Sequence, residues 1–185
     1  MEVTLEQFKQ RFKSLGDHFS SSKDLQALLQ NMTLTQVPAG TGLIAHRGEC
    51  STLYLVWEGS LSVSIEHSDG KKVVLGHIGP GEWVGEITLI DPGPATASVT
   101  ADSDSVVLAL PHEAFAKLRA SRPSAGGALL RSISLNLAER LRAHSGEVLQ
   151  KISGTEDRLL PETAHEKRAA MGLLAKLMGV RGDRQ

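Results

Sequence analysis

Residues 81–99 read GEWVGEITLIDPGPATASV and are the most informative part of the chain. The segment leaves a Pro-Gly turn, bends tightly at Gly85 and predicts a single helical turn over residues 86–90. Residues 92–94, Pro-Gly-Pro, end that turn, and a strand follows. The amino terminus of such a turn presents unpaired N–H groups and a partial positive charge. That arrangement favours a bound anion.

Two side chains of this segment suit a sugar phosphate. Glu86, at the start of the helical turn, can accept hydrogen bonds from sugar hydroxyls, and Thr96 can donate its hydroxyl to the anion. Taken alone, these few residues fit a capped turn between two strands at least as well.

The chain on both sides of this segment has the period of short β-strands. From Thr33 to Leu110 apolar and polar residues tend to alternate, and turn residues recur every several positions, which is typical of an antiparallel sandwich or barrel. The predicted strands are residues 33–37, 43–45, 53–57, 61–65, 73–78, 97–101 and 105–110.

Helical spacing replaces this alternation at both ends of the chain. Before the strands, a helix is expected from Leu5 to Leu15, stopped by Gly16, followed by a short helix in which Leu25, Leu28 and Leu29 form the apolar face. After them, helices are expected over residues 112–119, 125–152 and 162–178, with Gly154 ending the second. The long helix carries a stripe of Leu130, Ile133, Leu137, Leu141, His144 and Val148, adequate for a paired helix.

These patterns predict an α+β fold, a β-barrel or jelly roll framed by helices. Residues 1–30 form the amino-terminal helices and residues 31–111 the barrel, which includes the ligand-binding cassette at 81–99. Residues 112–153 form the carboxyl-terminal helices of the same domain, and residues 154–185 a helical extension.

Taken together, several segments resemble the cyclic-nucleotide-binding domain family, which includes the bacterial catabolite activator and the regulatory subunits of cAMP-dependent kinase. The resemblance spans roughly residues 20–150 in the right order and spacing. It rests on residues 40–44, 53–63, 75–81, 85–90, 94–101 and 136–142.

The resemblance assigns roles to individual residues of the cassette. It implies that Glu86 holds the ribose hydroxyl of cAMP or cGMP, and that Gly85 and Ile87 offer backbone contacts. Thr96 and Ala97 occupy the positions of the small residues beside the phosphate. No further cofactor and no metal are expected.

Ala95 departs from the family pattern, because it occupies the position of an arginine that neutralises the cyclic phosphate. Loss of a charge-assisted, often bidentate bond predicts binding weaker by about tenfold to more than a hundredfold. Three interpretations remain open. Binding persists through the helical turn and Thr96 with the help of another cation such as Arg47, the pocket prefers a different ligand, or the pocket is vestigial and the domain acts through protein contacts.

Residues 141–148 resemble the part of the catabolite activator's helix that contacts adenine. This predicts that His144 and Ser145 face the base, also across a dimer. The alternative is that His144 is one polar residue of the helix-pairing stripe.

Composition narrows the class of function. The sequence has scattered histidines, no HExxH motif, no phosphate-binding Walker loop and no Gly-x-Ser-x-Gly elbow, so an enzyme is not expected. The single cysteine, Cys50, excludes a disulfide within the chain.

A net charge of −1, and too few residues after Ile152 for a DNA-binding module, argue against DNA binding and a Crp-like regulator. No apolar window suggests a membrane span, and a cytoplasmic protein is expected.

Two functions remain. The first is a regulatory sensor that binds cyclic nucleotide weakly and signals through the long helix to a partner protein or a homodimer. The second is a degenerate domain that binds no nucleotide and serves as a protein–protein adaptor.

Overall fold

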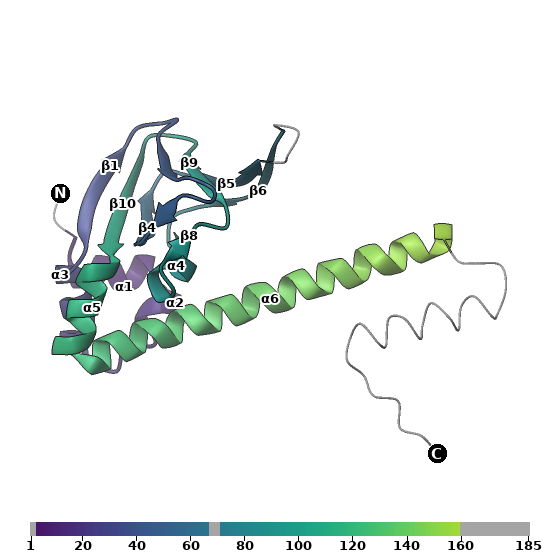
Figure 1. The fold of residues 1–185 in the computed structure, drawn as a ribbon. Helices are drawn as coiled ribbons and strands as arrows, with labels where there is room; N and C mark the ends of the chain where they lie inside the picture. Colours follow the sequence, from purple (N-terminus) through teal and green to yellow (C-terminus); the bar gives the residue numbers. More distant parts are fainter. Residues whose placement is uncertain (1–2, 67–70, 160–185) are drawn as a thin grey trace, which may run out of the picture. The chain divides into compact units, whose positions relative to one another are not determined.

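The structure is a computed structural model that describes residues 3–66 and 71–159, with side chains described as far as Arg142. The chain divides into two compact units, Met1–Asn136 and Leu137–Gln185. The first unit contains a β-barrel, the helices packed against it and the start of the long helix (Figure 1).

Two four-stranded antiparallel sheets form the barrel, which confirms the predicted α+β fold. The first sheet has the order β1 (Thr33–Val37), β10 (Ser105–Pro111), β4 (Thr52–Glu58) and β7 (Trp83–Val84). The second has the order β2 (Gly42–Ile44), β9 (Ser98–Ala101), β5 (Leu61–Glu66) and β6 (Lys72–Ile78). A small third sheet pairs β3 (Glu49–Cys50) with β8 (Gly93–Pro94). Because β3, β7 and β8 have two residues each, the sequence shows no alternation there, and no strands were predicted at those positions.

The inward faces of the two sheets enclose one apolar core. It is built from Val37, Ile44, Val56, Leu61, Ile78, Ala95, Val99, Ala101 and Val107. Strand alternation places the members of this core that lie on strands inside, because successive residues of a strand point to opposite faces. Ala95 lies in the loop between β8 and β9.

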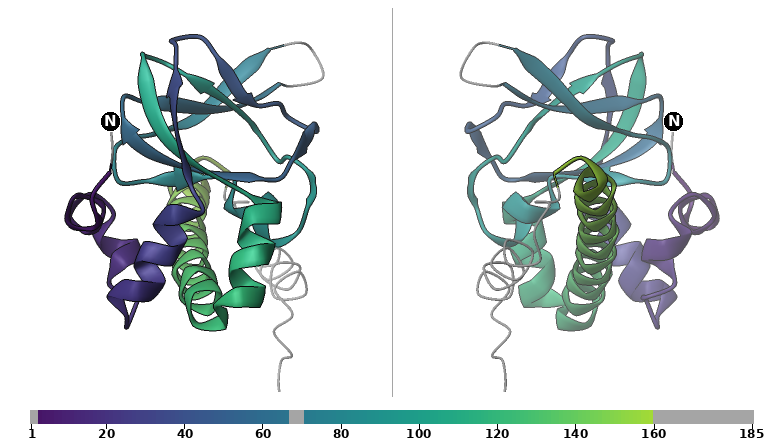
Figure 2. Two further views of the ribbon diagram at one scale, coloured as in Figure 1. Left: turned by 90° about the vertical axis from the view of Figure 1, so that its left-hand side faces the viewer. Right: turned by 90° about the vertical axis from the view of Figure 1, so that its right-hand side faces the viewer.

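The outward face of the first sheet packs against helices, which lie beneath the barrel in both views of Figure 2. These helices are α1 (Leu5–Arg11), α2 (Lys13–Gly16), α3 (Ser22–Gln30) and α5 (His112–Ser121). On β4, Leu53 and Leu55 are fully buried. The Phe12 ring lies 6.1 Å from that of Trp57, and the Phe8 ring 5.0 Å from that of Phe12.

The predicted helix over residues 5–15 is wrong in one respect, because it is divided at Phe12. Phe12 has φ −109° and ψ 57°, outside the helical region, and separates α1 from α2. Its fully buried ring packs between Phe8 and Trp57. Tertiary burial of an aromatic side chain, at about 1.5–3 kcal/mol, outweighs the loss of one helical hydrogen bond.

The long helix α6 spans Pro123–Leu159, so the predicted stop at Gly154 is wrong. An isolated glycine inside a helix costs only about 1 kcal/mol, which an uninterrupted helix tolerates. The buried face in the first unit is formed by Ala125, Leu129 and Ile133, while Leu141 is 69% exposed. The predicted helix over residues 162–178 and the end of the 154–185 extension lie outside the described residues.

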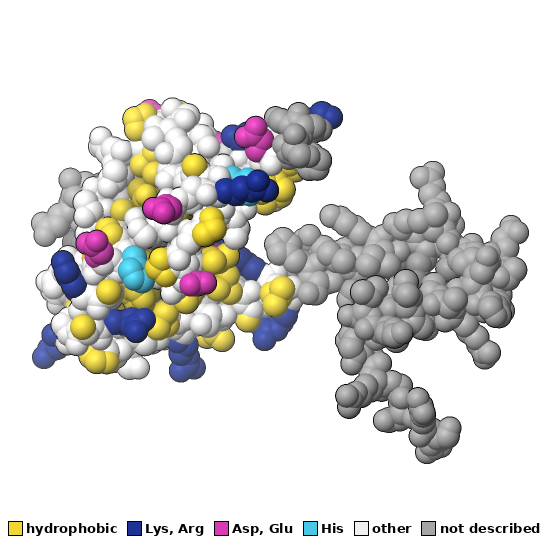
Figure 3. All heavy atoms as spheres, viewed as in Figure 1, with side chains coloured by type: hydrophobic (Ala, Val, Ile, Leu, Met, Phe, Trp, Pro, Cys, Tyr) yellow, Lys and Arg dark blue, Asp and Glu magenta, His cyan; other side chains and the backbone are white. Residues whose placement is uncertain are grey.

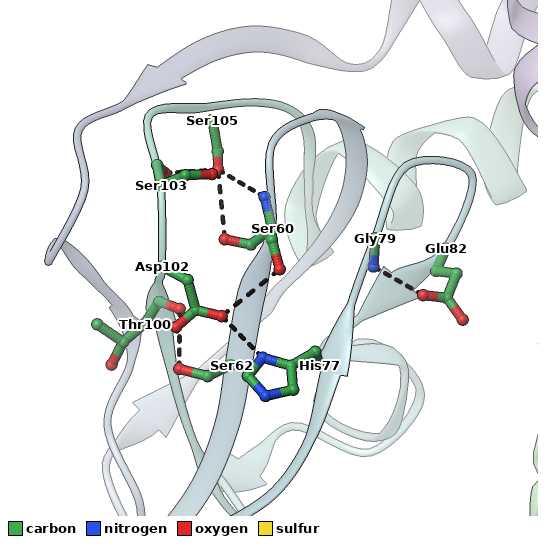
Figure 4. Close-up of polar contacts among 9 residues, drawn as sticks. All are labelled: Ser60, Ser62, His77, Gly79, Glu82, Thr100, Asp102, Ser103 and Ser105. Carbon is green, nitrogen blue, oxygen red and sulfur yellow. Dashed lines mark hydrogen bonds and ion pairs between the residues drawn. The ribbon is translucent and has the colours of Figure 1, made fainter.

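A polar cluster locks the register of β5, β6 and β9 at one end of the barrel (Figure 4). His77 Nδ1 and an Asp102 carboxylate oxygen are 2.9 Å apart, and the Ser62 hydroxyl donates to the Thr100 carbonyl. Contact with the Ser62 hydroxyl lowers the pKa of Asp102, and the hydrogen bond with His77 lowers it further. Glu82 also accepts a 2.7 Å hydrogen bond from the Gly79 N–H, which stabilises the turn at the start of the cassette.

Candidate functional site

The candidate site begins at Gly85, where the chain passes from β7 into the short helix α4 (Glu86–Ile90). Gly85 has φ +90°, a conformation that favours glycine. A Cβ at this position would collide with the backbone carbonyl of Thr52, the first residue of β4. Glycine is therefore required twice, once for the bend and once for the close approach of α4 to the barrel wall. The predicted bend and the predicted helical turn are confirmed, the latter with the same bounds.

Burial distinguishes the side chains of α4. Glu86 and Thr88 are each 5% exposed and Leu89 is fully buried, whereas Ile87 and Ile90 are about half exposed. The Thr88 hydroxyl donates to the Gly85 carbonyl at 3.1 Å, within the same turn. The Glu86 side chain is therefore directed into the protein. This burial costs free energy, because the carboxylate loses contact with water. Its burial beside the bend at Gly85 makes Glu86 a candidate ligand-binding residue.

The loop after α4 brings Ala95 to the turn that precedes β3. The Ala95 N–H donates to the Gly48 carbonyl at 2.9 Å, and the Ala95 carbonyl accepts from the Arg47 N–H at 2.8 Å. Ala95 is 5% exposed, and its methyl group belongs to the barrel core. The position that the resemblance gives to an arginine is thus directed inward, and here it carries no charge.

The remaining predicted site residues lie in two places. Thr96 is exposed and Ala97 is half-buried, both just before β9. His144 and Ser145 lie within α6 in the second unit, and their side chains are outside the described ones. The cassette residues 85–87 and 95–97 therefore belong to the first unit, while the predicted base contacts stay predictions.

The barrel interior also contains two polar groups that the sequence did not assign to the site, the phenol of Tyr54 and the thiol of Cys50. Both are half-buried and pack against the core cluster that includes Ala95. Burial raises the pKa of Tyr54, the neighbouring Cys50 raises it further, and a hydrogen bond with Thr52 lowers it. Tyr54 is paired with Val84, the residue before Gly85. The alternation in residues 53–57 was a signal that Tyr54 faces the same side as Val56.

Other classes of site find no support in the described residues. No group of three or more His, Cys, Asp or Glu side chains there is arranged to hold a metal ion. In the same part of the chain, no helix combines the length and apolarity that crossing a membrane requires.

The barrel, the amino-terminal helices and the long carboxyl-terminal helix together form the fold of cyclic-nucleotide-binding domains. The sequence profile described as the cyclic nucleotide-binding domain matches residues 34–122. The chain belongs to this family, whose members are regulatory domains.

Relatives named as transcriptional regulators share this domain. A CRP-like cAMP-activated global transcriptional regulator of Mycobacterium tuberculosis is 29% identical over 118 residues, which are 64% of this chain and 51% of that protein. The N-terminal domain of a Streptomyces coelicolor transcriptional regulator is 30% identical, with a TM-score of 0.61 over 71% of this chain and 91% of that one. The Thermus thermophilus catabolite activator protein is 28% identical, with a TM-score of 0.65 over 91% of this chain and 73% of that one. The chain spans about half the length of the first curated relatives it matches.

Proposed function

We propose that this domain is a regulatory sensor that binds a cyclic nucleotide, cAMP or cGMP, in the barrel beside α4. The observation that carries the proposal is the buried carboxylate of Glu86 directly after the left-handed Gly85. A carboxylate in this position accepts hydrogen bonds from ribose hydroxyls, and bonds to a charged group contribute about 1.5–3 kcal/mol each. Gly85 and Ile87 would contribute backbone contacts, and Thr96 and Ala97 would lie beside the phosphate.

Transmission from the ligand to the helices has a short route in this fold. The His112 Nδ1–H donates to the carbonyl of Leu89, in the last turn of α4, at 2.9 Å. The His112 N–H also donates to the Ser51 carbonyl at 2.6 Å, which anchors the start of α5 on the barrel. Movement of α4 on ligand binding would reach α5 through these bonds, and then α6. A ligand shifts this equilibrium only by its difference in affinity for the two states.

The output would be a change in a homodimer or a partner protein at α6. Leu141, on α6, is a large apolar side chain that is 69% exposed. Pairing of α6 with a second helix would bury it, and this is the interface that a homodimer would use.

Calorimetric titration of the purified protein with cAMP and cGMP tests the sensor. We expect saturable binding in the micromolar range, weakened at least tenfold in Glu86→Ala and unaffected in Glu58→Ala, an exposed glutamate at the end of β4. Absence of heat at a few hundred micromolar of either ligand, in protein shown to be folded, would contradict the sensor proposal.

A protein–protein adaptor is the second candidate, favoured by Ala95. An alanine methyl in the core cannot neutralise a phosphate, as expected of a domain that has lost its ligand. The adaptor candidate predicts that Glu86→Ala leaves partner binding unchanged, whereas the sensor predicts dependence on nucleotide.

A Crp-like transcription regulator is a further candidate, because the relatives of known function carry that name. On the face shown in Figure 3, Lys and Arg side chains are scattered among acidic and apolar ones and form no stripe. Salt-dependent binding to duplex DNA would support this candidate, because phosphate contacts release counterions.

A further inference from the structure

Arg47 has an unusual backbone conformation next to the candidate site. It is the single non-glycine residue with positive φ, at +61°, among the described residues 3–66 and 71–159. It occupies the third position of a turn in which the Gly48 N–H donates to the Ala45 carbonyl at 2.9 Å. Glycine or asparagine is the usual residue where a turn needs positive φ. A residue that retains such a conformation, at a cost of about 1–3 kcal/mol, is a candidate for a functional role.

The turn that contains Arg47 is hydrogen-bonded directly to Ala95, the position at which the family pattern has an arginine. The Arg47 N–H donates to the Ala95 carbonyl at 2.8 Å, and the Gly48 carbonyl accepts from the Ala95 N–H at 2.9 Å. The pairing continues in the adjoining strands, where Glu49 is opposite Pro94 and Cys50 opposite Gly93. Arg47 and Ala95 therefore lie next to each other just outside the paired strands β3 and β8, joined by a backbone hydrogen bond.

The Arg47 side chain is available for a ligand. It is exposed, and within the described part of the chain no hydrogen bond, salt bridge or cation–π contact engages its guanidinium. Ala95 has the opposite character, since its methyl is enclosed in the barrel core. The neighbouring positions thus supply a small buried side chain and a long cationic one.

We propose that Arg47 supplies the positive charge that Ala95 lacks and binds the phosphate of the ligand from the turn between β2 and β3. The inference rests on the proposed function, because it names the residue that makes a cyclic nucleotide acceptable to this pocket. The planar guanidinium suits a phosphate, and it carries its charge at any pH at which the protein is folded. Arg47 is a ligand-binding residue in this scheme and takes no part in the core.

The test compares two ligands, cAMP and adenosine, which lacks the phosphate, by calorimetry on four proteins. These are the wild type, Arg47→Gly, Arg47→Lys, and the control Arg131→Ala, which removes an exposed arginine from α6. Arg47→Gly is expected to fold, because glycine fits φ +61° without strain, and thermal unfolding should occur at an equal or higher temperature.

We expect Arg47→Gly to weaken cAMP binding by about tenfold to more than a hundredfold and to change adenosine binding less than about twofold. Arg47→Lys should retain part of the cAMP affinity, and Arg131→Ala all of it. Unchanged cAMP binding by Arg47→Gly overturns the inference and leaves the sensor proposal intact. Equal losses for cAMP and adenosine overturn it as well, because the phosphate would then not be the group recognised. A wild type that binds neither ligand overturns both proposals.

Discussion

Gly85 lies so close to the carbonyl of Thr52 that a Cβ on Gly85 would overlap the carbonyl oxygen. The contact joins the start of α4 to the first residue of β4, and it is available only to a residue without a side chain. Since Gly85 also has φ +90°, the approach and the bend impose the same requirement. The position of Glu86 inside the protein depends on this relationship.

Gly85→Ala should destabilise the protein more than Gly40→Ala does. Gly40 has φ +80° but nothing within 4 Å of a Cβ, so its substitution isolates the cost of the left-handed backbone, about 1–2 kcal/mol. Gly85→Ala adds a steric collision, which brings its cost to about 2–5 kcal/mol. Urea unfolding of the two variants measures the difference. Equal losses would show that the Thr52 contact relaxes without cost.

His112→Ala should weaken the connection between α4 and the carboxyl-terminal helices. The substitution removes the 2.9 Å hydrogen bond to the Leu89 carbonyl and should cost about 1 kcal/mol of folding free energy. In the sensor, it should also reduce the change in amide hydrogen exchange that a nucleotide induces in α5. His77→Ala, which removes an exposed histidine paired with Asp102, serves as the control and should leave that change intact. A full response of α5 in His112→Ala would contradict this route.

Ala95→Arg should affect stability and binding in opposite directions. In the absence of ligand, a guanidinium in place of a core methyl should lower the free energy of unfolding by about 1–3 kcal/mol. With cAMP present, the added charge should tighten binding about tenfold or more. Ala95→Leu, similar in overpacking but uncharged, should lose stability without gaining affinity. If both variants bind equally weakly, the position does not face the phosphate.

The Tyr54 phenol should titrate above its ordinary pKa of 10.0, because its burial and the neighbouring Cys50 both disfavour the charged form. The contribution of the protonated phenol to the free energy of unfolding is therefore fully present below pH 10. As the pH rises above 10 the unfolded chain loses its proton first, so stability falls until the folded-state pKa is passed. Tyr54 is the single tyrosine of the chain, so tyrosinate absorbance reports it directly. A native protein that titrates at or below the value of the denatured protein would contradict the prediction.

Leu141→Glu should disrupt a homodimer if α6 pairs with a second copy. Leu141 is 69% exposed, and a charge in a helix-pairing interface is costly. Sedimentation of the wild type should then show a dimer, and Leu141→Glu a monomer. Arg142→Glu alters the adjacent exposed position and should remain dimeric. Identical sedimentation of wild type and Leu141→Glu would assign Leu141 to a different contact or to none.

Much of the fold followed from local patterns. Strand β1 and helix α4 have the bounds that the sequence predicted, because alternation, glycine bends and proline stops act within a few residues. The break at Phe12 and the continuation of α6 through Gly154 did not follow from local patterns. The first depends on the packing of Phe12 against Trp57, a distant residue, and the second on a long helix that accommodates a glycine.

The residues of the candidate site divide in the same way. Gly85 and Glu86 were identified from the bend and the helical turn of one segment, and Ala95 from the resemblance to the cyclic-nucleotide-binding family. Their burial, the inward direction of Ala95 and the proximity of Tyr54 and Cys50 are results of tertiary structure. So is the pairing of Arg47 with Ala95, 48 positions apart in the sequence, since a sheet brings distant segments into contact through backbone hydrogen bonds that carry no residue signature.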